Sequence, residues 1–404
     1  MNTQVKLDEK RAAVQNEAVN SWDLCGRKGV IEAITGIGKN FIFLKALHRC
    51  EKGISVLFLA EQIDREYDLM KDIEKFDTLN GTSTLKDYNI QFMTYQSAYK
   101  LSDKHWDFVC ADEIHDSLTP EYSKFYFNNT FKYFIGLSAT IPYTRYVTDD
   151  GVEYTKRDLL LGIAPICYKY NLKRGQEEKT SRPLNIIVVE GELDNTKLSI
   201  EAGNKKIKFK TTEKKAYEYW DGVFNKAMYL NARSREFMLR RAAAKRAEVL
   251  YKLPSKIETA KNILKRLKGK TLVFGNDLDT LEEIVPGGLI SSRNSAKENK
   301  EIRDKFDRDE INVIASFKKL KQGANLKGLD NILITSYYSS TKDLIQRVGR
   351  LRKEGEKVGN VIILVTKNTK EESWFFKMFK SLGINELKIS SKNIGDIDKY
   401  LEYN

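Results

Sequence analysis

The segment AITGIGKN at residues 33–40 constrains the fold of this chain more than any other. The residues before it, GVIEA at 29–33, are typical of a buried strand, and FIFLKAL at 41–47 is typical of a helix. A strand, a glycine loop and a helix in that order place backbone N–H groups at a helix N-terminus, where they can bind phosphate. The segment therefore predicts an α/β fold with a nucleotide-binding loop. The loop residues are Thr35, Gly36, Ile37, Gly38, Lys39 and Asn40.

Short apolar strand candidates alternate with helical stretches in two parts of the chain. The candidates lie at residues 55–60, 90–94, 108–111 and 133–137 in the first part, and at 271–274, 311–315, 331–335 and 358–365 in the second. Apolar runs of this length are typical of the buried strands of parallel sheets. We therefore expect a first lobe at residues 1–165, a junction with a helical and β insertion at 166–254, and a second lobe with a helical tail at 255–404.

The junction contains an amphipathic helix that is strongly basic. An apolar stripe at helical spacing runs from Leu239 to Leu250, and the basic residues around it include Arg240, Arg241 and Lys245. This basic face could follow a phosphate backbone, or it could be a solvated face of a helix that packs on the second lobe. The sequence leaves both interpretations open.

The net charge favours an anionic partner. The formal charge is +13 and the pI is near 9.2, and nucleic acid is the commonest partner of a basic soluble protein. The alternative is a solvated lysine-rich surface.

Cysteine spacing and hydropathy indicate the compartment. The four cysteines lie far apart with no CxxC pair, so neither a zinc site nor a disulfide framework is expected. The first residues lack an apolar signal region, and no apolar run approaches the roughly 18 residues of a membrane span. We therefore expect a cytoplasmic protein without a membrane partner.

A second candidate for chemistry is FVCADEIH at residues 108–115, an apolar strand that ends in two adjacent carboxylates. Asp112 at a strand end can face a magnesium ion, and Glu113 can act as general base toward an attacking water. Two acidic residues can also simply cap a strand. Their position after a phosphate loop favours the catalytic interpretation.

These two segments resemble the first two motifs of the superfamily 2 helicases and translocases of the DExH type. Further segments resemble the family's other motifs in the family's order, from RAAVQNEAV through MTYQS, GLSATIP, LVFGN and SFKKLKQGANL to QRVGRLR. The sequences of these motifs are similar to those of compact phage and DNA-repair members such as the UvsW and XPB groups.

The resemblance implies roles for individual residues. Gln15 would read adenine, Gly323 and Asn325 would contact nucleotide and strand, and Gln346, Arg347 and Arg350 would act at the γ-phosphate. His115, Ser138 and Thr140 would couple hydrolysis to movement of the lobes. The nucleic-acid contacts of the first lobe would be Gln62, Thr94, Gln96 and Ser97.

Two positions depart from the family pattern. Asn40 stands where a Ser or Thr usually binds magnesium, and its carboxamide oxygen can also ligate a hard cation. The last arginine of the sixth motif is displaced, because Lys353 holds its usual place and Arg352 comes one residue earlier. Both departures concern the rate of hydrolysis.

The resemblance implies two tandem RecA-like lobes that use ATP and Mg²⁺ to move along DNA in replication, recombination or repair, in a phage or bacterial setting. RNA as the track is one alternative. A slowly hydrolysing, nucleotide-gated clamp or annealing protein is the other. We expect a monomer, because the same chain supplies the arginines.

Overall fold

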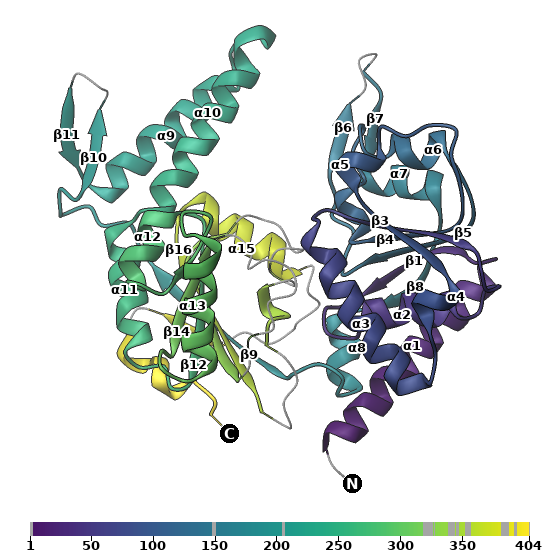
Figure 1. Ribbon diagram of the computed structural model, residues 1–404. Helices are drawn as coiled ribbons and strands as arrows, with labels where there is room; N and C mark the ends of the chain where they lie inside the picture. Colours follow the sequence, from purple (N-terminus) through teal and green to yellow (C-terminus); the bar gives the residue numbers. More distant parts are fainter. Residues whose placement is uncertain are drawn as a thin grey trace. The chain divides into compact units, whose positions relative to one another are not determined.

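The computed structural model describes residues 3–147, 151–203, 207–317, 326, 328–337, 344, 347–351, 357–380, 388–391 and 394–403. The chain divides into two compact units (Figure 1). One comprises Met1–Ser181 with Thr341–Gly355, and the other comprises Arg182–Ser340 with Glu356–Asn404. Both units are built on a parallel sheet with helices on its faces, which confirms the expected α/β class.

The first unit contains a six-stranded sheet whose strand pairs are all parallel. Its strands, in order across the sheet, are β3 (Asn89–Thr94), β2 (Ser55–Ala60), β4 (His105–Asp112), β5 (Thr130–Ser138), β1 (Lys28–Ala33) and β8 (Ile166–Tyr170). The helices are α1 (Thr3–Leu24), α2 (Lys39–Leu47), α3 (Asp64–Asn80), α4 (Thr84–Asp87), α5 (Tyr95–Ala98), α6 (Lys124–Asn128), α7 (Lys156–Ile163) and α8 (Leu172–Glu177). A short antiparallel pair, β6 (Arg145–Val147) and β7 (Glu153–Thr155), precedes α7.

Alternate residues of these strands enter two separate hydrophobic cores, one on each face of the sheet. Ile31 and Phe58 belong to one core, whereas their neighbours Val30 and Leu57 belong to the other. A strand that is buried on both faces has to be apolar throughout, which explains why the sequence shows apolar runs instead of alternation. Trp22 of α1 fixes its helix to this sheet, since its indole N–H donates to the carbonyl of Phe134 at 2.7 Å.

The second unit contains a seven-stranded sheet, again with parallel pairs only. Its strands, in order, are β13 (Leu289–Ile290), β14 (Val313–Phe317), β12 (Lys270–Gly275), β15 (Leu329–Ile334), β16 (Gly359–Thr366), β9 (Leu184–Gly191) and β17 (Lys388–Ser391). The helices that belong to it are α11 (Pro254–Leu264), α12 (Leu278–Ile284), α13 (Ala296–Asp307) and α15 (Lys370–Lys380). The tail helix α15 buries Phe375 and Met378.

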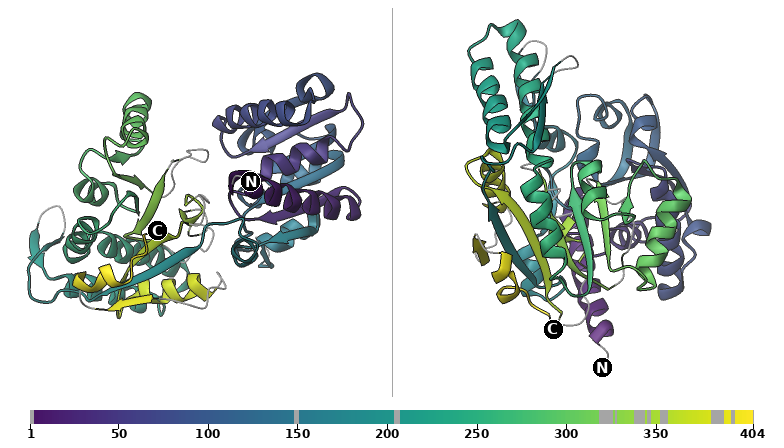
Figure 2. Two further views of the ribbon diagram at one scale, coloured as in Figure 1. Left: turned by 90° about the horizontal axis from the view of Figure 1, so that it is seen from below. Right: turned by 90° about the vertical axis from the view of Figure 1, so that its left-hand side faces the viewer.

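An appendage follows β9. It consists of the antiparallel strands β10 (Ile200–Gly203) and β11 (Lys208–Thr211) and of two long helices, α9 (Glu213–Ala227) and α10 (Ala232–Tyr251). Figure 1 and the right-hand view of Figure 2 show α9 and α10 as neighbouring helices. Between them, Arg246 forms an ion pair with Asp221 and lies over the ring of Phe224 at 4.4 Å. Part of the basic face is therefore used for packing.

The structure places the expected boundaries differently. The first unit extends past residue 165, because β8 pairs with β1 in parallel. The strand expected within the junction is β9, which lies in the second sheet and pairs with β16 from Leu184 to Gly191. The insertion proper is thus confined to the segment between β9 and α11. Composition could not reveal this, since strand pairing partners are distant in sequence.

Candidate nucleotide and magnesium site

The loop between β1 and α2 has a backbone that only glycine adopts easily. Gly36 and Gly38 have φ angles of 93° and 87°, and Gly38 caps the N-terminus of α2 in the left-handed conformation. A Cβ atom at Gly38 would lie 2.7 Å from the side-chain nitrogen of Gln15. The backbone of the loop therefore comes close to the side chain of Gln15. The first N–H groups of α2 lie directly after the loop, as a phosphate site requires.

Gln15 reaches this loop from α1. Its side chain is buried, and its Nε2 donates to the carbonyl of Ile37 at 2.9 Å. The structure thus joins Gln15 to the loop.

Lys39, the first residue of α2, forms an ion pair with Glu113. Its Nζ lies 2.6 Å from Glu113 Oε1, and both side chains are about nine-tenths buried, with exposed fractions of 11% and 10%. Glu113 follows β4 in a left-handed conformation with φ of 49°. Such a backbone costs of order 1–3 kcal/mol for a residue other than glycine, and it is common at functional sites.

The protonation of Glu113 is set by its neighbours. Burial raises the pKa of Glu113, but the charges of Lys39 and His115 and the hydrogen bond from Lys39 outweigh burial and hold this pKa well below its ordinary value. Glu113 is therefore ionised at neutral pH, as a general base has to be.

Asp112, the last residue of β4, forms an ion pair with Arg65 of α3. The guanidinium donates to Asp112 Oδ2 from Nε at 3.0 Å and from Nη2 at 2.7 Å. The other carboxylate oxygen, Oδ1, is buried and receives no hydrogen bond from any described residue. One oxygen of Asp112 is thus held and the other is available.

Asn40 shows the same arrangement. Its Nδ2 donates to Asp72 Oδ2 of α3 at 2.7 Å, whereas its Oδ1 is buried and accepts no hydrogen bond within the described part of the chain. Two orphaned oxygens next to a phosphate loop fit a hard cation, which takes one or two protein ligands and completes its shell with water and phosphate oxygens. The described residues contain no group of three or more His, Cys, Asp or Glu side chains that could hold a metal by themselves.

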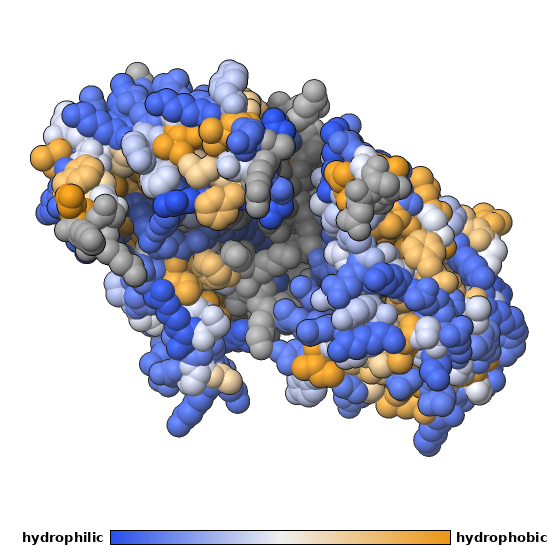
Figure 3. Space-filling model, turned by 90° about the horizontal axis from the view of Figure 1, so that it is seen from above, coloured by the Kyte–Doolittle hydropathy of each residue, from blue (hydrophilic) through white to orange (hydrophobic). Residues whose placement is uncertain are grey.

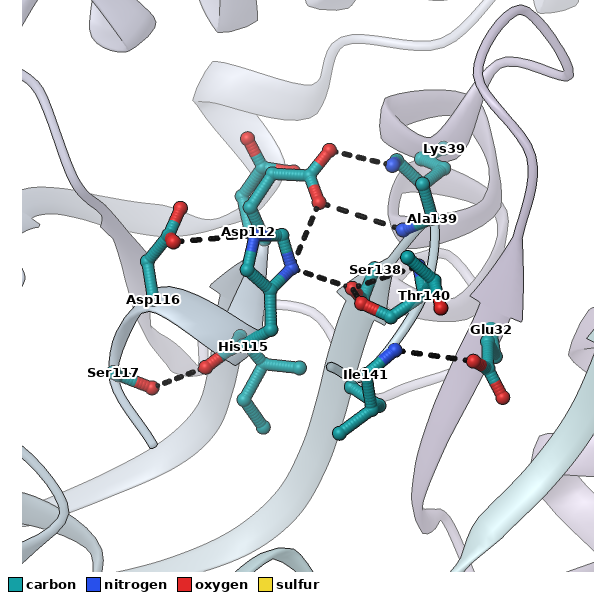
Figure 4. A network of polar contacts seen from close by, with 12 residues as sticks. Glu32, Lys39, Asp112, His115, Asp116, Ser117, Ser138, Ala139, Thr140 and Ile141 are labelled. Atoms are coloured by element: carbon teal, nitrogen blue, oxygen red, sulfur yellow. Dashed lines mark hydrogen bonds and ion pairs between the residues drawn. The ribbon is translucent and has the colours of Figure 1, made fainter. Parts of the chain in front are cut away.

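The end of β5 is connected to Glu113 through polar contacts (Figure 4). His115 is fully buried, and its Nδ1 lies 2.6 Å from Ser138 Oγ and 3.3 Å from Glu113 Oε2. Ser138 Oγ in turn donates to the carbonyl of Thr140 at 2.9 Å, and the N–H of Ala139 donates to Glu113 Oε2 at 3.4 Å. The three residues expected to couple hydrolysis to movement therefore form one network with the candidate base.

The nucleic-acid residues expected in the first unit lie at one edge of its sheet. Ala60 of β2 and Thr94 of β3 are register partners, so Gln62 and the MTYQS segment follow parallel strands at the same edge. Gln62, Gln96 and Ser97 are exposed, and Thr94 Oγ1 accepts from the N–H of Ser97 at 3.3 Å.

The basic residues of the insertion are exposed on α10. Arg240 pairs with Glu236 and Lys245 pairs with Glu248, both on the helix surface. Hydrophilic residues are interspersed with apolar ones on the face of the molecule shown in Figure 3.

Of the sixth motif, Arg347 is buried and Arg350 is half-buried. Gln346, Gly323 and Asn325 lie outside the described residues.

Sequence reasoning missed Arg65 and Asp72. Arg65, Asp68 and Asp72 recur at helical spacing within DREYDLMKD, which is a signal for one charged face of a helix. Their partners, Asp112 and Asn40, could be found only from the placement of α3.

Two family models match this chain. The model described as "Type III restriction enzyme, res subunit" matches residues 6–143, and the model described as "Helicase conserved C-terminal domain" matches residues 255–355. A relative in Sulfurisphaera tokodaii, named DNA 3'-5' translocase XPB2, is 25% identical over 372 aligned positions, and the match covers 88% of this chain and 81% of the relative.

Solved structures share the fold. The ATP-dependent Type ISP restriction-modification enzyme LlaBIII bound to DNA has a TM-score of 0.58 at 14% identity, and the match covers 99% of this chain but only 32% of that enzyme. S. cerevisiae Dbp5 bound to RNA and ADP BeF3 has a TM-score of 0.56 at 11% identity and 96% coverage, with 90% of Dbp5 covered. The Pyrococcus furiosus Hef helicase domain has a TM-score of 0.50 at 16% identity, covering 88% of this chain and 96% of that domain.

No helix in the described part of the chain is both long and apolar enough to cross a membrane. The first family model covers the phosphate loop and the Asp-Glu pair at the strand end. The helicase C-terminal model covers much of the second parallel-sheet unit. The chain, with its two RecA-like lobes, belongs to the superfamily 2 helicases.

Proposed function

We propose that this protein hydrolyses ATP to move along DNA or to remodel it. The observation that carries the proposal is the contact between Lys39 and Glu113, since it joins a phosphate-loop lysine to a carboxylate that is held ionised. The name of the relative XPB2, a DNA translocase, supports DNA as the track.

ATP would bind through the loop residues Thr35 to Asn40, with Lys39 on the β and γ phosphates. Lys39 would then have to leave Glu113, and Glu113 would accept a proton from the attacking water. Gln15, already on the loop, would read adenine.

Magnesium would be held by the two orphaned oxygens of Asn40 and Asp112. When bound, the cation neutralises developing charge on the phosphates. Asn40 and Asp112 would each present to the cation one oxygen that accepts no hydrogen bond from the described residues.

Further roles follow the family motifs. Arg347 and Arg350, with Gln346, would neutralise transition-state charge at the γ-phosphate, a contribution of about 10³ to 10⁵ in rate for comparable arginine fingers. Gly323 and Asn325 would contact nucleotide and strand. His115, Ser138 and Thr140 would transmit the state of Glu113 to the rest of the motor.

The track would contact four residues at the edge of the first sheet, namely Gln62, Thr94, Gln96 and Ser97. Arg240, Arg241 and Lys245 of α10 would add phosphate contacts. Contacts to phosphate and sugar carry no sequence information directly, so binding would be sequence-independent.

The test is the rate of phosphate release at one fixed salt concentration with single-stranded DNA, branched duplex DNA or RNA. Salt is fixed because affinity for nucleic acid falls steeply with it. We expect stimulation by DNA and near-complete loss of that stimulated rate in Glu113→Gln. An unchanged rate in Glu113→Gln would contradict the proposal that this protein hydrolyses ATP at this site.

The same measurement separates the alternatives. Stimulation by RNA alone would make the protein an RNA helicase. Slow turnover that Asn40→Thr strongly accelerates would favour a nucleotide-gated clamp, since Asn40 is the departure that this alternative rests on.

We further propose a monomer in a reducing cytoplasm. All of the proposed catalytic residues come from one chain, and all four cysteines are free in the structure. Sedimentation with and without nucleotide tests the oligomeric state.

A further inference from the structure

One face of α3 carries charged residues that contact both candidate magnesium ligands. Arg65 contacts Asp112 and also donates from Nη1 to Asp68 Oδ2 at 3.0 Å, and Asp72 accepts from Asn40. Arg65 and Asp72 are seven residues apart, close to two helical turns, so they share one side of the helix. One element thus reaches a loop residue and a strand-end residue that are far apart in sequence.

The contact with Asp112 is asymmetric. Both guanidinium hydrogen bonds end on Oδ2, and Asp112 is almost fully buried with an exposed fraction of 1%. A buried carboxylate without a partner is costly, so Arg65 both compensates the charge and fixes which oxygen remains available. That oxygen is Oδ1.

The contact with Asn40 determines the direction of its amide. Asn40 Nδ2 donates to Asp72 Oδ2 at 2.7 Å, so the NH₂ group of Asn40 faces Asp72. Its Oδ1 then points away from Asp72 and stays unpartnered among the described residues. A Ser or Thr in this position would need no such partner, because a hydroxyl oxygen presents lone pairs in several directions by rotation.

We propose that α3 is the positioning element of the magnesium site, with Asp72 orienting Asn40 and Arg65 orienting Asp112. This proposal rests on the proposed function, because it assigns partners to the ligands of that same site. It also explains how an asparagine functions where the family has a hydroxyl: Asp72 fixes the amide so that its oxygen is presented. Asp72 and Arg65 are positioning residues and do not touch the substrate.

The test measures metal binding apart from turnover. The affinity of Mn²⁺, as a paramagnetic substitute for Mg²⁺, is measured by electron paramagnetic resonance in the presence of ADP, and ADP affinity is measured separately in EDTA. We expect Asp72→Asn to weaken Mn²⁺ binding by about 10- to 100-fold, the usual effect of losing a partner of a metal ligand. ADP affinity in EDTA and the melting temperature should change little.

Glu74→Gln is the matched control, because it makes the same carboxylate-to-amide change at an exposed position of the same helix. A second comparison uses Asn40→Thr as background. There, Asp72→Asn should have at most a several-fold effect on Mn²⁺ affinity, since a hydroxyl does not need to be oriented.

The outcomes are distinguishable. If the unmodified protein binds no Mn²⁺ with ADP, the proposed function fails. If it binds Mn²⁺ but Asp72→Asn behaves like Glu74→Gln, or weakens binding equally in the Asn40→Thr background, the role of α3 is overturned while the proposed function stands.

Discussion

Lys39 and Glu113 lie 74 positions apart in the chain, and their side chains meet at 2.6 Å between Nζ and Oε1. This contact joins the start of α2 to the end of β4. Because Lys39 is also the residue that should bind phosphate, it cannot fully serve both partners at once. Nucleotide binding should therefore release Glu113 from its lysine and leave it beside His115 and the N–H of Ala139.

We expect Glu113→Gln to bind ATP with little change but to hydrolyse it about 10²- to 10⁴-fold more slowly, because an amide cannot accept the proton of water. Equilibrium binding of a fluorescent ATP analogue and single-turnover phosphate release measure the two effects. Lys39→Ala is the comparison, since it should weaken binding itself. A loss of binding in Glu113→Gln as large as in Lys39→Ala would contradict the assignment of Glu113 as base.

The contact between Lys39 and Glu113 should also make stability depend on pH. The pKa of Glu113 is lowered from the ordinary value of 4.5 to about 2, against the effect of burial, by the charges of Lys39 and His115. A carboxyl whose pKa is depressed in the folded state stabilises above its unfolded pKa and loses this contribution as pH falls through its folded pKa. Between about pH 4.5 and pH 2, the unmodified protein should lose more stability than Glu113→Gln does.

Urea denaturation of both proteins at several pH values measures this difference. Parallel loss of stability in the two proteins over this window would show that the depressed pKa of Glu113 contributes nothing. The comparison cancels the titration of other carboxyl groups, because the two proteins share them.

The sequence predicts much of the fold because buried parallel strands are apolar on both faces. The strand expected at residues 55–60 is β2 (Ser55–Ala60), and the one expected at 90–94 is β3 (Asn89–Thr94). The glycine loop is equally visible, since positive φ angles at Gly36 and Gly38 favour one residue type.

Other features depend on pairings between distant residues and leave no local pattern. The strand β9 lies beside β16, more than 170 residues further along the chain, and so it belongs to the second sheet. Arg65 and Asp72 are ordinary charges on an amphipathic helix until α3 is placed against Asp112 and Asn40. The identity of their partners is therefore a result of tertiary structure alone.

Lys256 and Glu371 form a buried ion pair that joins α11 to α15. Lys256 Nζ lies 2.7 Å from Glu371 Oε2, and their side chains have exposed fractions of 7% and 0%. Glu371 also accepts from the N–H of Thr366. Removing one partner of a buried pair leaves an uncompensated charge, so Lys256→Met should cost about 3–5 kcal/mol of unfolding free energy.

The double variant Lys256→Met with Glu371→Gln should recover part of this loss, because the remaining buried charge is removed. Urea denaturation followed by intrinsic tryptophan fluorescence, to which Trp374 of α15 contributes, measures each variant. Equal stability of the single and double variants would contradict an energetic role for the buried charge. Lys261→Met is a control, since Lys261 pairs with Glu283 at a more exposed position, where ion pairs contribute about 0–1 kcal/mol.

The exposed basic residues of α10 allow a test of the DNA track. If Arg240, Arg241 and Lys245 bind phosphates, replacing all three with alanine should weaken binding to DNA of any sequence. The slope of log affinity against log salt should also become shallower by about 0.9 for each phosphate that is no longer neutralised on duplex DNA. Fluorescence anisotropy at several salt concentrations measures both quantities.

Lys265→Ala is the control, since Lys265 is an exposed lysine at the end of α11, outside the insertion. A uniform loss of affinity with an unchanged salt dependence would mean that these residues act through the fold of the insertion. An unchanged affinity would leave them as a solvated face, which was the alternative interpretation of this helix.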